Sequence, residues 1–408
     1  MTRAASQFVQ SVKGTAEDGA RQAARQTRGR PKARKLLQVL KNARRVLVTC
    51  HRHPDPDALG SAAALAFLLR DQLPKTGKHK DVVVDMSVPG DVGGGVNAAF
   101  TRHARFDIKP WDDQRLIDPE NQSAYDAVVL CDVQPTFPYS PLPREVSVVT
   151  SGKFPTAVID HHRRRGGKHK LPFSDIRTDV GATASIVFSY FAELDVPVPP
   201  DLAATLLYAI ESDLAGAAGQ PSDLDNAALS SLTLLADTKR LYRMRNVALP
   251  QHYYMSFANA LASASVYDGV MFAHLGEITN LEKPAVVADF LIRYESATWS
   301  LVTALTGKNA EDRPTRLLVS ARTCQGDLSA GEAMRKAMLR LGEGGGHRNK
   351  AGGFIDLENG SPTEIDRVRL KFRRRFLKAL GMQADTRGKR LLEADCDPDV
   401  SVPVMFDS

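Results

Sequence analysis

The chain has 408 residues, of which 43% are hydrophobic and 25% charged, a composition that is ordinary for a globular protein and predicts two or three domains. It contains no run of about 18 apolar residues, so no membrane span is expected, and its first residues lack the apolar core of a secretory signal. Four scattered cysteines form no Cys-x-x-Cys pair, which argues against a zinc knuckle or a disulfide framework. We therefore expect a cytoplasmic protein that does not contact membranes.

The net charge of +7 comes from the N-terminal segment. Residues 1–45 carry 12 Lys/Arg and two Asp/Glu, so the rest of the chain has a net charge of −3. We treat residues 1–43 as a basic N-terminal extension, which can contact RNA or DNA. A solvated tail, or a helix at Pro31–Ala43 that packs on the next domain, fits the same residues. The composition is also similar to that of a transit peptide.

Strand and helix patterns alternate along residues 44–240. Short apolar runs predict buried strands at Arg45–Cys50, Val82–Val88, Ala127–Leu130 and Ala157–Ile159. Longer Ala- and Leu-rich segments predict helices at Ala58–Leu73, Thr183–Leu194, Leu202–Glu211 and Asn226–Ala236. Strands that are apolar at every position are typical of a parallel sheet covered on both faces. We therefore predict an α/β fold with a mainly parallel sheet in this domain.

The pattern changes after residue 240. Residues 241–265 are rich in Arg, Tyr and Met and predict a helical linker. Beyond it we expect strands at Val270–Leu275, Ala285–Ile292, Trp299–Leu305, Arg316–Val319 and Gly353–Leu357, and helices at Gly331–Leu341 and Glu364–Leu380. These elements make residues 266–382 a smaller α+β domain. Residues 383–408 have weak periodicity and are expected to form a loose C-terminal tail.

Histidines and acids gather in four short segments, three of which follow a predicted strand. The segments are His51–Asp57, Cys131–Asp132, Asp160–His162 and Glu211–Asp213. Because ligands bind at the carboxyl ends of the strands in open α/β sheets, we expect these side chains to meet there. Imidazole and carboxylate groups bind divalent cations. Gathered carboxylates repel each other by about 1 kcal/mol per pair at 4 Å even in water, so the clustering predicts a metal-dependent enzyme.

Three of these segments also have a simpler interpretation. Asp55 and Asp57 could cap a helix, although Pro54 and Pro56 add a stiffness that a cap does not need. Asp132 could cap a turn. Asp213 could be a solvated residue after a helix, where the helix dipole disfavours a negative charge unless a cation is near.

Two glycine runs and one basic run complete the set of candidate sites. Gly344, Gly345 and Gly346 predict a loop whose backbone N–H groups bind phosphate, with His347 adding a donor; a flexible loop is the alternative. Gly93–Gly95 is predicted to be a simple loop, because no Lys-Ser/Thr follows it. The cations of residues 163–170 could bind further phosphates or form a solvated loop.

In their order along the chain, these segments resemble the motifs of the DHH/DHHA1 phosphoesterase family. This family includes RecJ-like exonucleases, oligoribonucleases with 3′-phosphoadenosine-5′-phosphate phosphatase activity, and cyclic-dinucleotide phosphodiesterases. His51–Ser61 (HRHPDPDALGS) resembles the first motif, Asp132 the second, Asp160–His162 the third and Asp213 the fourth. Gly344–Gly353 (GGGHRNKAGG) resembles the signature of the DHHA1 domain. The resemblance covers residues 44–380.

The resemblance implies a site for two divalent cations, Mn²⁺ or Mg²⁺. It implies one cation held by His51, Asp55 and Asp132 and another held by Asp57, Asp132, His161 and Asp213. Asp132 and His162 would be catalytic, with His162 facing the scissile phosphate. It further implies substrate binding by Arg322, Gly344, Gly345, Gly346 and His347. Two positions depart from the family pattern: Leu214 follows Asp213 where Thr is usual, and His53 stands where many members have Asn.

The activity implied is hydrolysis of phosphodiester or phosphomonoester bonds in short oligonucleotides or small nucleotides, such as nanoRNA, 3′-phosphoadenosine-5′-phosphate or cyclic dinucleotides. A phosphoanhydride hydrolase, such as an exopolyphosphatase, is the second reading. It ranks lower because the Ser-Arg-Lys-Lys-Gln element of the related pyrophosphatases is absent. A nucleic-acid-binding protein without turnover is the third. The sequence leaves a homodimer open.

Overall fold

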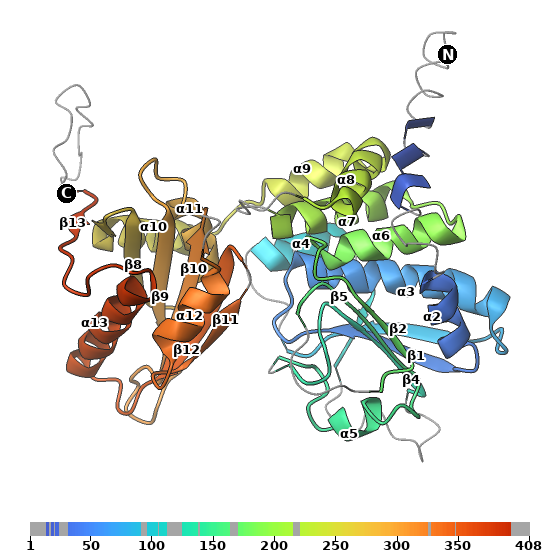
Figure 1. The fold of residues 1–408 in the computed structure, drawn as a ribbon, viewed down its shortest axis with the longest axis horizontal. Coiled ribbons are helices and arrows are strands. Elements are labelled where there is room, and N and C mark those ends of the chain that lie inside the picture. Colours follow the sequence, from blue (N-terminus) through green and yellow to red (C-terminus); the bar gives the residue numbers. More distant parts are fainter. Residues whose placement is uncertain are drawn as a thin grey trace, which may run out of the picture. The chain divides into compact units, whose positions relative to one another are not determined.

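The structure is a computed structural model that describes residues 14–15, 18–19, 21–23, 32–90, 96–104, 106–111, 125–137, 139–163, 170–214, 221–324, 328–346 and 348–392. The chain forms two compact units, the first ending at Ala248 and the second beginning at Leu249 (Figure 1). Over these ranges, no helix combines the length and the apolar character needed to cross a membrane.

The first unit is built on a six-stranded parallel sheet in the order β3-β2-β1-β4-β5-β6. Its strands are β1 (Arg45–Cys50), β2 (Val83–Ser87), β3 (Ile108–Lys109), β4 (Ala127–Cys131), β5 (Thr156–Asp160) and β6 (Phe173–Ile176). Its helices are α2 (Lys32–Leu40), α3 (Pro56–Thr76), α4 (Val96–Ala104), α5 (Val146–Val149), α6 (Thr183–Leu194), α7 (Pro200–Leu214), α8 (Asp223–Leu235) and α9 (Thr238–Arg245). The α/β fold with a parallel sheet is confirmed.

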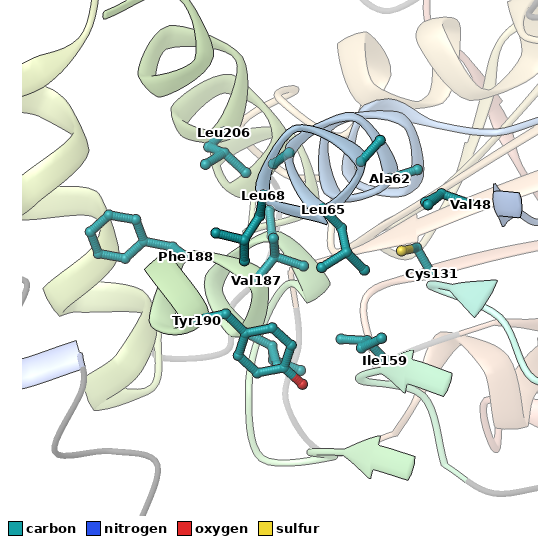
Figure 2. Close-up of a cluster of buried hydrophobic side chains, with 14 of the residues drawn as sticks. Val48, Ala62, Leu65, Leu68, Cys131, Ile159, Val187, Phe188, Tyr190 and Leu206 are labelled. Carbon is teal, nitrogen blue, oxygen red and sulfur yellow. The ribbon is translucent and has the colours of Figure 1, made fainter. Parts of the chain in front are cut away.

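Alternate residues of the central strands enter two different hydrophobic clusters. Val48, Cys131 and Ile159 face helices α3 and α6, where they meet Leu65 and Val187 (Figure 2). The intervening strand residues form a second cluster on the opposite face, made of Leu47, Val128, Leu130 and Val158. Fully burying a side chain of this size contributes about 1.5–3 kcal/mol. Coverage on both faces explains why every position of these strands is apolar.

Helix α2 is part of this core. Leu36, Leu37 and Leu40 are buried in the same cluster as α3 and α6. Its first turn is capped from a distance, because the Glu193 carboxylate accepts hydrogen bonds from the backbone N–H groups of Ala33 and Arg34 at 3.0 and 3.3 Å. Among the alternatives for the basic N-terminal segment, the structure therefore shows a helix that packs on the domain, and this helix spans residues 32–40.

The second unit is built on a seven-stranded mixed sheet in the order β11-β12-β10-β9-β8-β7-β13. Its strands are β7 (Ser265–Tyr267), β8 (Val270–Glu277), β9 (Trp299–Thr306), β10 (Arg316–Thr323), β11 (Glu343–Gly346), β12 (Lys350–Asp356) and β13 (Lys389–Arg390). Helices α10 (Gln251–Ser263) and α11 (Lys283–Leu291) share a cluster on one face. Helices α12 (Ala330–Met338) and α13 (Pro362–Ala379) pack on the other (Figure 1).

Three sequence predictions in this unit are wrong, one of them in part. Residues 383–408 were expected to form a loose C-terminal tail, but Lys389–Arg390 form β13, which pairs with β7. Residues 285–292 were expected to form a strand, but they lie in helix α11 and its C-cap, with Pro284 in the first turn. Gly344–Gly346 were expected to form a loop, but they belong to β11, paired with β12. The glycines are required by close packing: a Cβ at Gly344 would lie 2.8 Å from the Cγ atoms of Met334 and Met338 on α12.

Candidate metal centre

The histidines and acids of the first unit meet at the carboxyl ends of three neighbouring strands. His51 follows β1, Asp132 follows β4, and Asp160 ends β5. The strand order runs through β2 and β3 on one side of β1 and through β4 to β6 on the other, so the chain changes direction between β1 and β4. Open α/β sheets bind ligands at such a switch point.

Three overlapping groups of side chains at this edge have the composition of cation ligands. One potential ligand atom from each member lies within 4.8 Å of the others in each group: His51, Asp55 and Asp132; Asp57, His161 and Asp213; and Asp132, His161 and His162. Asp132 and His161 each belong to two groups. The third group connects the other two, because it shares Asp132 with the first and His161 with the second. His161 Nε2 lies 3.5 Å from Asp132 Oδ1 and 3.5 Å from Asp213 Oδ2.

Both histidines expected to bind cations are oriented by a backbone carbonyl. His51 Nδ1 lies 2.9 Å from Arg52 O, and His161 Nδ1 lies 3.3 Å from Val180 O. A carbonyl oxygen only accepts hydrogen bonds, so each Nδ1 carries the proton. Nε2 of His51 lies 3.6 Å from Asp132 Oδ2, and Nε2 of each ring is the nitrogen nearest the carboxylates. This is the arrangement that prepares a histidine for a metal ion.

Asp57 is held by the N-terminus of a helix from elsewhere in the chain. Its carboxylate accepts hydrogen bonds from the backbone N–H groups of Thr183 and Ala184 at 2.8 and 2.9 Å. Helix α6 has Ala182 at its N-cap position and no side-chain cap of its own. Asp57 therefore satisfies the first N–H groups of α6 and is fixed by them. These hydrogen bonds offset the cost of burying its carboxylate, since the residue is only 1% exposed.

Asp132 lies at the centre of the site in an unusual backbone conformation. Its φ is 57°, in the left-handed region that Asp and Asn occupy more readily than most residues. The Thr183 hydroxyl donates to Asp132 Oδ1 at 2.9 Å. Burial alone would raise the pKa of Asp132, but the charge and hydrogen bond of His162, with His51 and His161 nearby, hold that pKa well below its usual value.

The pKa values of two other carboxylates, Asp55 and Asp57, are raised by burial and by neighbouring negative charges. Burial, together with the charges of Asp132 and Asp213, raises the pKa of Asp57 well above its usual value. Burial and the same two charges also raise the pKa of Asp55, against the opposing charge of His51. A divalent cation among these oxygens would relieve both the repulsion and the burial cost. The donor set, with its histidines and carboxylates, therefore fits a pair of divalent cations.

His162 is positioned differently from His161. Its Nδ1 lies 2.6 Å from Asp160 Oδ1, and Gln134 Nε2 donates to the other Asp160 oxygen at 2.7 Å. Burial lowers the pKa of His162, but the charges of and hydrogen bonds to Asp132 and Asp160 outweigh it and raise the pKa to about 11. Asp160 thus orients the His162 ring, while its own oxygens are occupied by Gln134 and His162.

Sequence reasoning did not identify Thr183, Gln134 or the N-terminus of α6 as parts of this site. The only local signal for α6 was the absence of a capping side chain before Thr183. Asp213 was expected to follow a helix, but it lies in the last turn of α7. Its neighbour Leu214 packs on the segment that precedes α6, because a Cβ at Gly181 would lie 2.4 Å from Leu214 Cδ2.

The residues expected to bind substrate belong to the second unit. Arg322 is 8% exposed, and its Nε and Nη2 atoms donate to the two oxygens of Asp289 at 2.5 and 3.2 Å. Gly344, Gly345 and Gly346 form an edge strand, which leaves one side of their backbone without a strand partner. His347, Gly93–Gly95 and residues 164–169 lie outside the described residues.

Comparison with known proteins finds a family model that matches most of the first unit. Residues 45–210 match the model described as "DHH family, N-terminal domain". An uncharacterized protein of Methanocaldococcus jannaschii is 29% identical over 313 residues, which cover 76% of this chain and 58% of that protein. A probable manganese-dependent inorganic pyrophosphatase of Enterococcus faecalis is 27% identical over 169 residues, which cover 41% of this chain and 48% of that protein. The chain thus spans about half the length of these curated relatives.

Among solved structures, an exopolyphosphatase-related protein from Bacteroides fragilis has a similar fold. The TM-score is 0.58 at 13% sequence identity, over 86% of this chain and 97% of that protein. At this identity the similarity concerns the fold alone. It extends over both units and agrees with an α/β domain followed by a smaller second domain.

Proposed function

We propose that the chain is a metal-dependent phosphoesterase with two divalent cations, Mn²⁺ or Mg²⁺, because residues 45–210 match the model of the DHH family N-terminal domain. Its substrates would be short oligonucleotides or small nucleotides, such as nanoRNA, 3′-phosphoadenosine-5′-phosphate or cyclic dinucleotides. The observation that carries the proposal is the set of three overlapping ligand groups at the sheet edge, linked through Asp132 and His161. Names of relatives support the chemistry, since the Enterococcus faecalis protein is described as manganese-dependent.

In this proposal, His51, Asp55 and Asp132 hold one cation, and Asp57, Asp132, His161 and Asp213 hold the other. Divalent cations in such a site supply positive charge at the phosphoryl oxygens and activate water for attack on phosphorus. The protein's own contribution is to fix the ligands in advance. Carbonyl oxygens fix the rings of His51 and His161, and the N-terminus of α6 fixes Asp57.

We assign His162 to the substrate. Its Nδ1 is committed to Asp160, which Gln134 in turn holds, so the ring is kept in one orientation beside Asp132. A fixed imidazole that donates to a phosphoryl oxygen stabilises charge that develops during hydrolysis. Arg322 and the edge strand Gly344–Gly346 are assigned to substrate phosphate binding, with His347, as an extension of the same proposal.

Phosphoanhydride hydrolysis is the alternative that a specific observation favours, because the Enterococcus faecalis relative is a probable pyrophosphatase. That match covers 41% of this chain. One panel separates the two functions: 3′-phosphoadenosine-5′-phosphate, di- to pentanucleotides, cyclic dinucleotides, pyrophosphate and polyphosphate, each incubated with the full chain and Mn²⁺. We expect release of phosphate or mononucleotide from a nucleotide substrate. Faster hydrolysis of pyrophosphate or polyphosphate would replace the proposal with the alternative.

The site itself is tested with a matched pair of variants. Asp132→Asn keeps the shape and tolerates the positive φ but removes a charge shared by two ligand groups. Because loss of residues that merely support a metal ligand costs 10–100-fold, loss of this ligand is expected to lower kcat/KM by at least about 100-fold. Asp175→Asn, a buried carboxylate of β6 outside these groups, serves as the control. Equal rates for Asp132→Asn and wild type would exclude this site.

A further inference from the structure

Helix α13 in the second unit carries a concentration of positive charge that the proposed hydrolysis does not use. Its 18 residues include seven Lys/Arg and two acids. Both acids have structural partners. The Glu364 carboxylate accepts hydrogen bonds from the backbone N–H groups of Glu358, Asn359 and Gly360, and Asp366 pairs with Arg369 at 3.3 Å. The helix therefore keeps a large net positive charge.

Three of the cations have a structural role. Arg369 pairs with Asp366, and Arg373 donates to the Tyr267 hydroxyl at 2.6 Å while its guanidinium lies 5.0 Å from the centre of that ring. Arg375 donates to the carbonyl oxygen of Leu339, just after α12, at 2.6 Å. These contacts account for the side chains that face the body of the unit.

The remaining four cations form one exposed stripe, made of Arg367, Lys371, Arg374 and Lys378. At about 100° per residue, they lie within roughly 60° of one another around the helix axis. The stripe lies opposite Phe372 and Phe376, which are buried in the core. Among the residues that the structure describes, none of the four has an acidic partner within salt-bridge distance, although Glu364 exerts some attraction on Arg367.

This arrangement is unfavourable for the protein alone. Like charges three or four residues apart on a helix destabilise it by about 0.2–0.5 kcal/mol per pair, and the stripe contains three such pairs. Cations are favoured near the C-terminus of a helix, but Arg367 stands in the first half of α13 and Lys371 at its middle. A polyanionic partner would offset this repulsion.

The buried face of α13 decides between kinds of partner. Insertion into a lipid surface requires a free apolar face, whereas Val368, Phe372, Phe376 and Leu377 are already packed in the core of the unit. The stripe itself offers no exposed aromatic ring for base stacking. The face therefore suits the repeating phosphates of a nucleic acid strand, bound without regard to base sequence.

The chain that follows α13 carries further cations. A Cβ at Gly388 would lie 2.5–2.8 Å from the Tyr267 ring, so this segment crosses the tyrosine that also contacts Arg373. The neighbours of Gly388, Arg387 and Lys389, are exposed cations. These cations lie next to β13 at the edge of the sheet, on the side where Arg373 contacts Tyr267, and are not counted as part of the stripe.

We propose that the exposed stripe of α13 is a docking surface for the phosphate backbone of a nucleic acid strand. Successive cations are three or four residues apart, which corresponds to about 4.5–6 Å along the helix, and the whole stripe extends about 16 Å. The surface belongs to the second unit, outside the metal centre. It goes beyond the proposed hydrolysis and does not depend on it.

The test measures binding of a fluorescein-labelled 20-nucleotide oligouridylate to the full chain by anisotropy, from 50 to 300 mM KCl and with EDTA to prevent turnover. The variant Lys371→Gln/Arg374→Gln/Lys378→Gln removes three cations. Each phosphate contact contributes about 0.7 to the slope of log K against log salt, so we expect a slope smaller by about 2 and binding weaker by on the order of 100-fold at 0.1 M salt.

Two controls isolate the stripe. Lys75→Gln/Lys78→Gln/Lys80→Gln removes three exposed cations from the first unit, and it should bind within about twofold of wild type. Lys371→Arg/Arg374→Lys/Lys378→Arg keeps the charge and should bind normally. Circular dichroism confirms folding of each variant.

Three results would overturn the proposal: no RNA binding by wild type at 50 mM KCl, equal loss in the two glutamine variants, or preferential binding of vesicles with phosphatidylserine. Hydrolysis of a dinucleotide with Mn²⁺ should be unchanged in the α13 variant. Binding is measured with EDTA and therefore does not require activity. A protein that is inactive but still binds RNA through α13 would contradict the proposed activity alone. An active protein whose RNA binding does not change in the α13 variant would contradict the docking surface alone.

Discussion

Replacing Asp132 by Asn should remove most of the stabilisation that manganese gives to the first unit. Asp132 contributes to two of the three ligand groups, and its carboxylate lies 3.6 Å from His51 Nε2 and 3.5 Å from His161 Nε2. Asn preserves the volume and accepts the φ of 57°. The backbone turn at the end of β4 is therefore retained, and the loss is confined to charge and ligation.

The size of the effect follows from binding linkage. A cation at 100 times its Kd stabilises the folded state by about 2.7 kcal/mol. One kcal/mol shifts the Tm of a domain of 150–250 residues by about 2–4 °C, so one manganese ion should raise the Tm of the first unit by roughly 5–10 °C. The stability of the metal-free variant is not diagnostic, because the substitution removes both the attraction to three histidines and the repulsion by neighbouring carboxylates.

The assay is thermal unfolding with 1 mM MnCl₂ or with EDTA, comparing wild type, Asp132→Asn and Asp175→Asn. Asp175 is buried and bound by Arg177, Tyr190 and Lys32, so its loss should lower the Tm in both conditions. The manganese shift of Asp175→Asn should nevertheless equal that of wild type. A full shift in Asp132→Asn, or no shift in wild type, would refute the assignment of this edge as a metal centre.

Three further outcomes follow from the same contacts. Thr183→Val removes the hydroxyl that donates to Asp132 and should weaken manganese binding about 10–100-fold, whereas Thr183→Ser should not; equal titrations of the two variants would contradict this. Burial lowers the pKa of His51, but Asp132 and Asp55 outweigh it and raise the pKa to about 9, so the metal-free ring is protonated at pH 7. Manganese must displace that proton, and calorimetry in buffers of different ionisation enthalpy should show proton release and an affinity that rises from pH 6 to pH 8. Burial, with the charge of Arg369, lowers the pKa of His274 to about 4, below the unfolded value near 6.5, so acid favours unfolding. The urea concentration at the unfolding midpoint of the second unit should decrease as the pH is lowered from 6.5 to 4, and His274→Gln should make that decrease smaller.

The sequence predicted that the candidate ligands lie at one edge of the sheet because two strong local signals coincide. The strands β1, β4 and β5 are apolar throughout, which fixes them as central strands of a parallel sheet. His51, Asp132 and Asp160 come at or directly after their ends, and parallel strands bring such ends to one edge. The assignment of each side chain to a particular cation remains a prediction from the family resemblance.

The supporting residues could not be predicted, since they act over long sequence distances. Thr183 reaches Asp132 across 51 residues, and its backbone N–H reaches Asp57 across 126. Gln134 contacts Asp160 across 26 residues. A threonine or glutamine has no pattern that marks it as a partner of one carboxylate rather than of water.

The wrong predictions in the second unit have local causes. A mostly apolar segment of eight residues, interrupted here by Asp289, fits either a strand or a short helix, and α11 took the helical form after Pro284. Gly344–Gly346 suggested a loop because glycine is permissive. The structure instead uses their lack of side chains to place α12 directly on β11, where a Cβ at Gly331 would lie 2.2 Å from Gly346 O.

The departure at Leu214 has a structural context in this chain. Leu214 Cδ2 packs against Gly181, and the Gly181 N–H donates to Asp225 Oδ2 at 2.8 Å. Asp225 is itself buried and forms the capping box of α8 with Ser222. Together these contacts hold the segment that enters α6, two residues before the N–H and hydroxyl groups that Thr183 gives to Asp57 and Asp132. An apolar contact and a carboxylate from α8 thus fix the start of α6, so a leucine after Asp213 is compatible with an ordered metal centre.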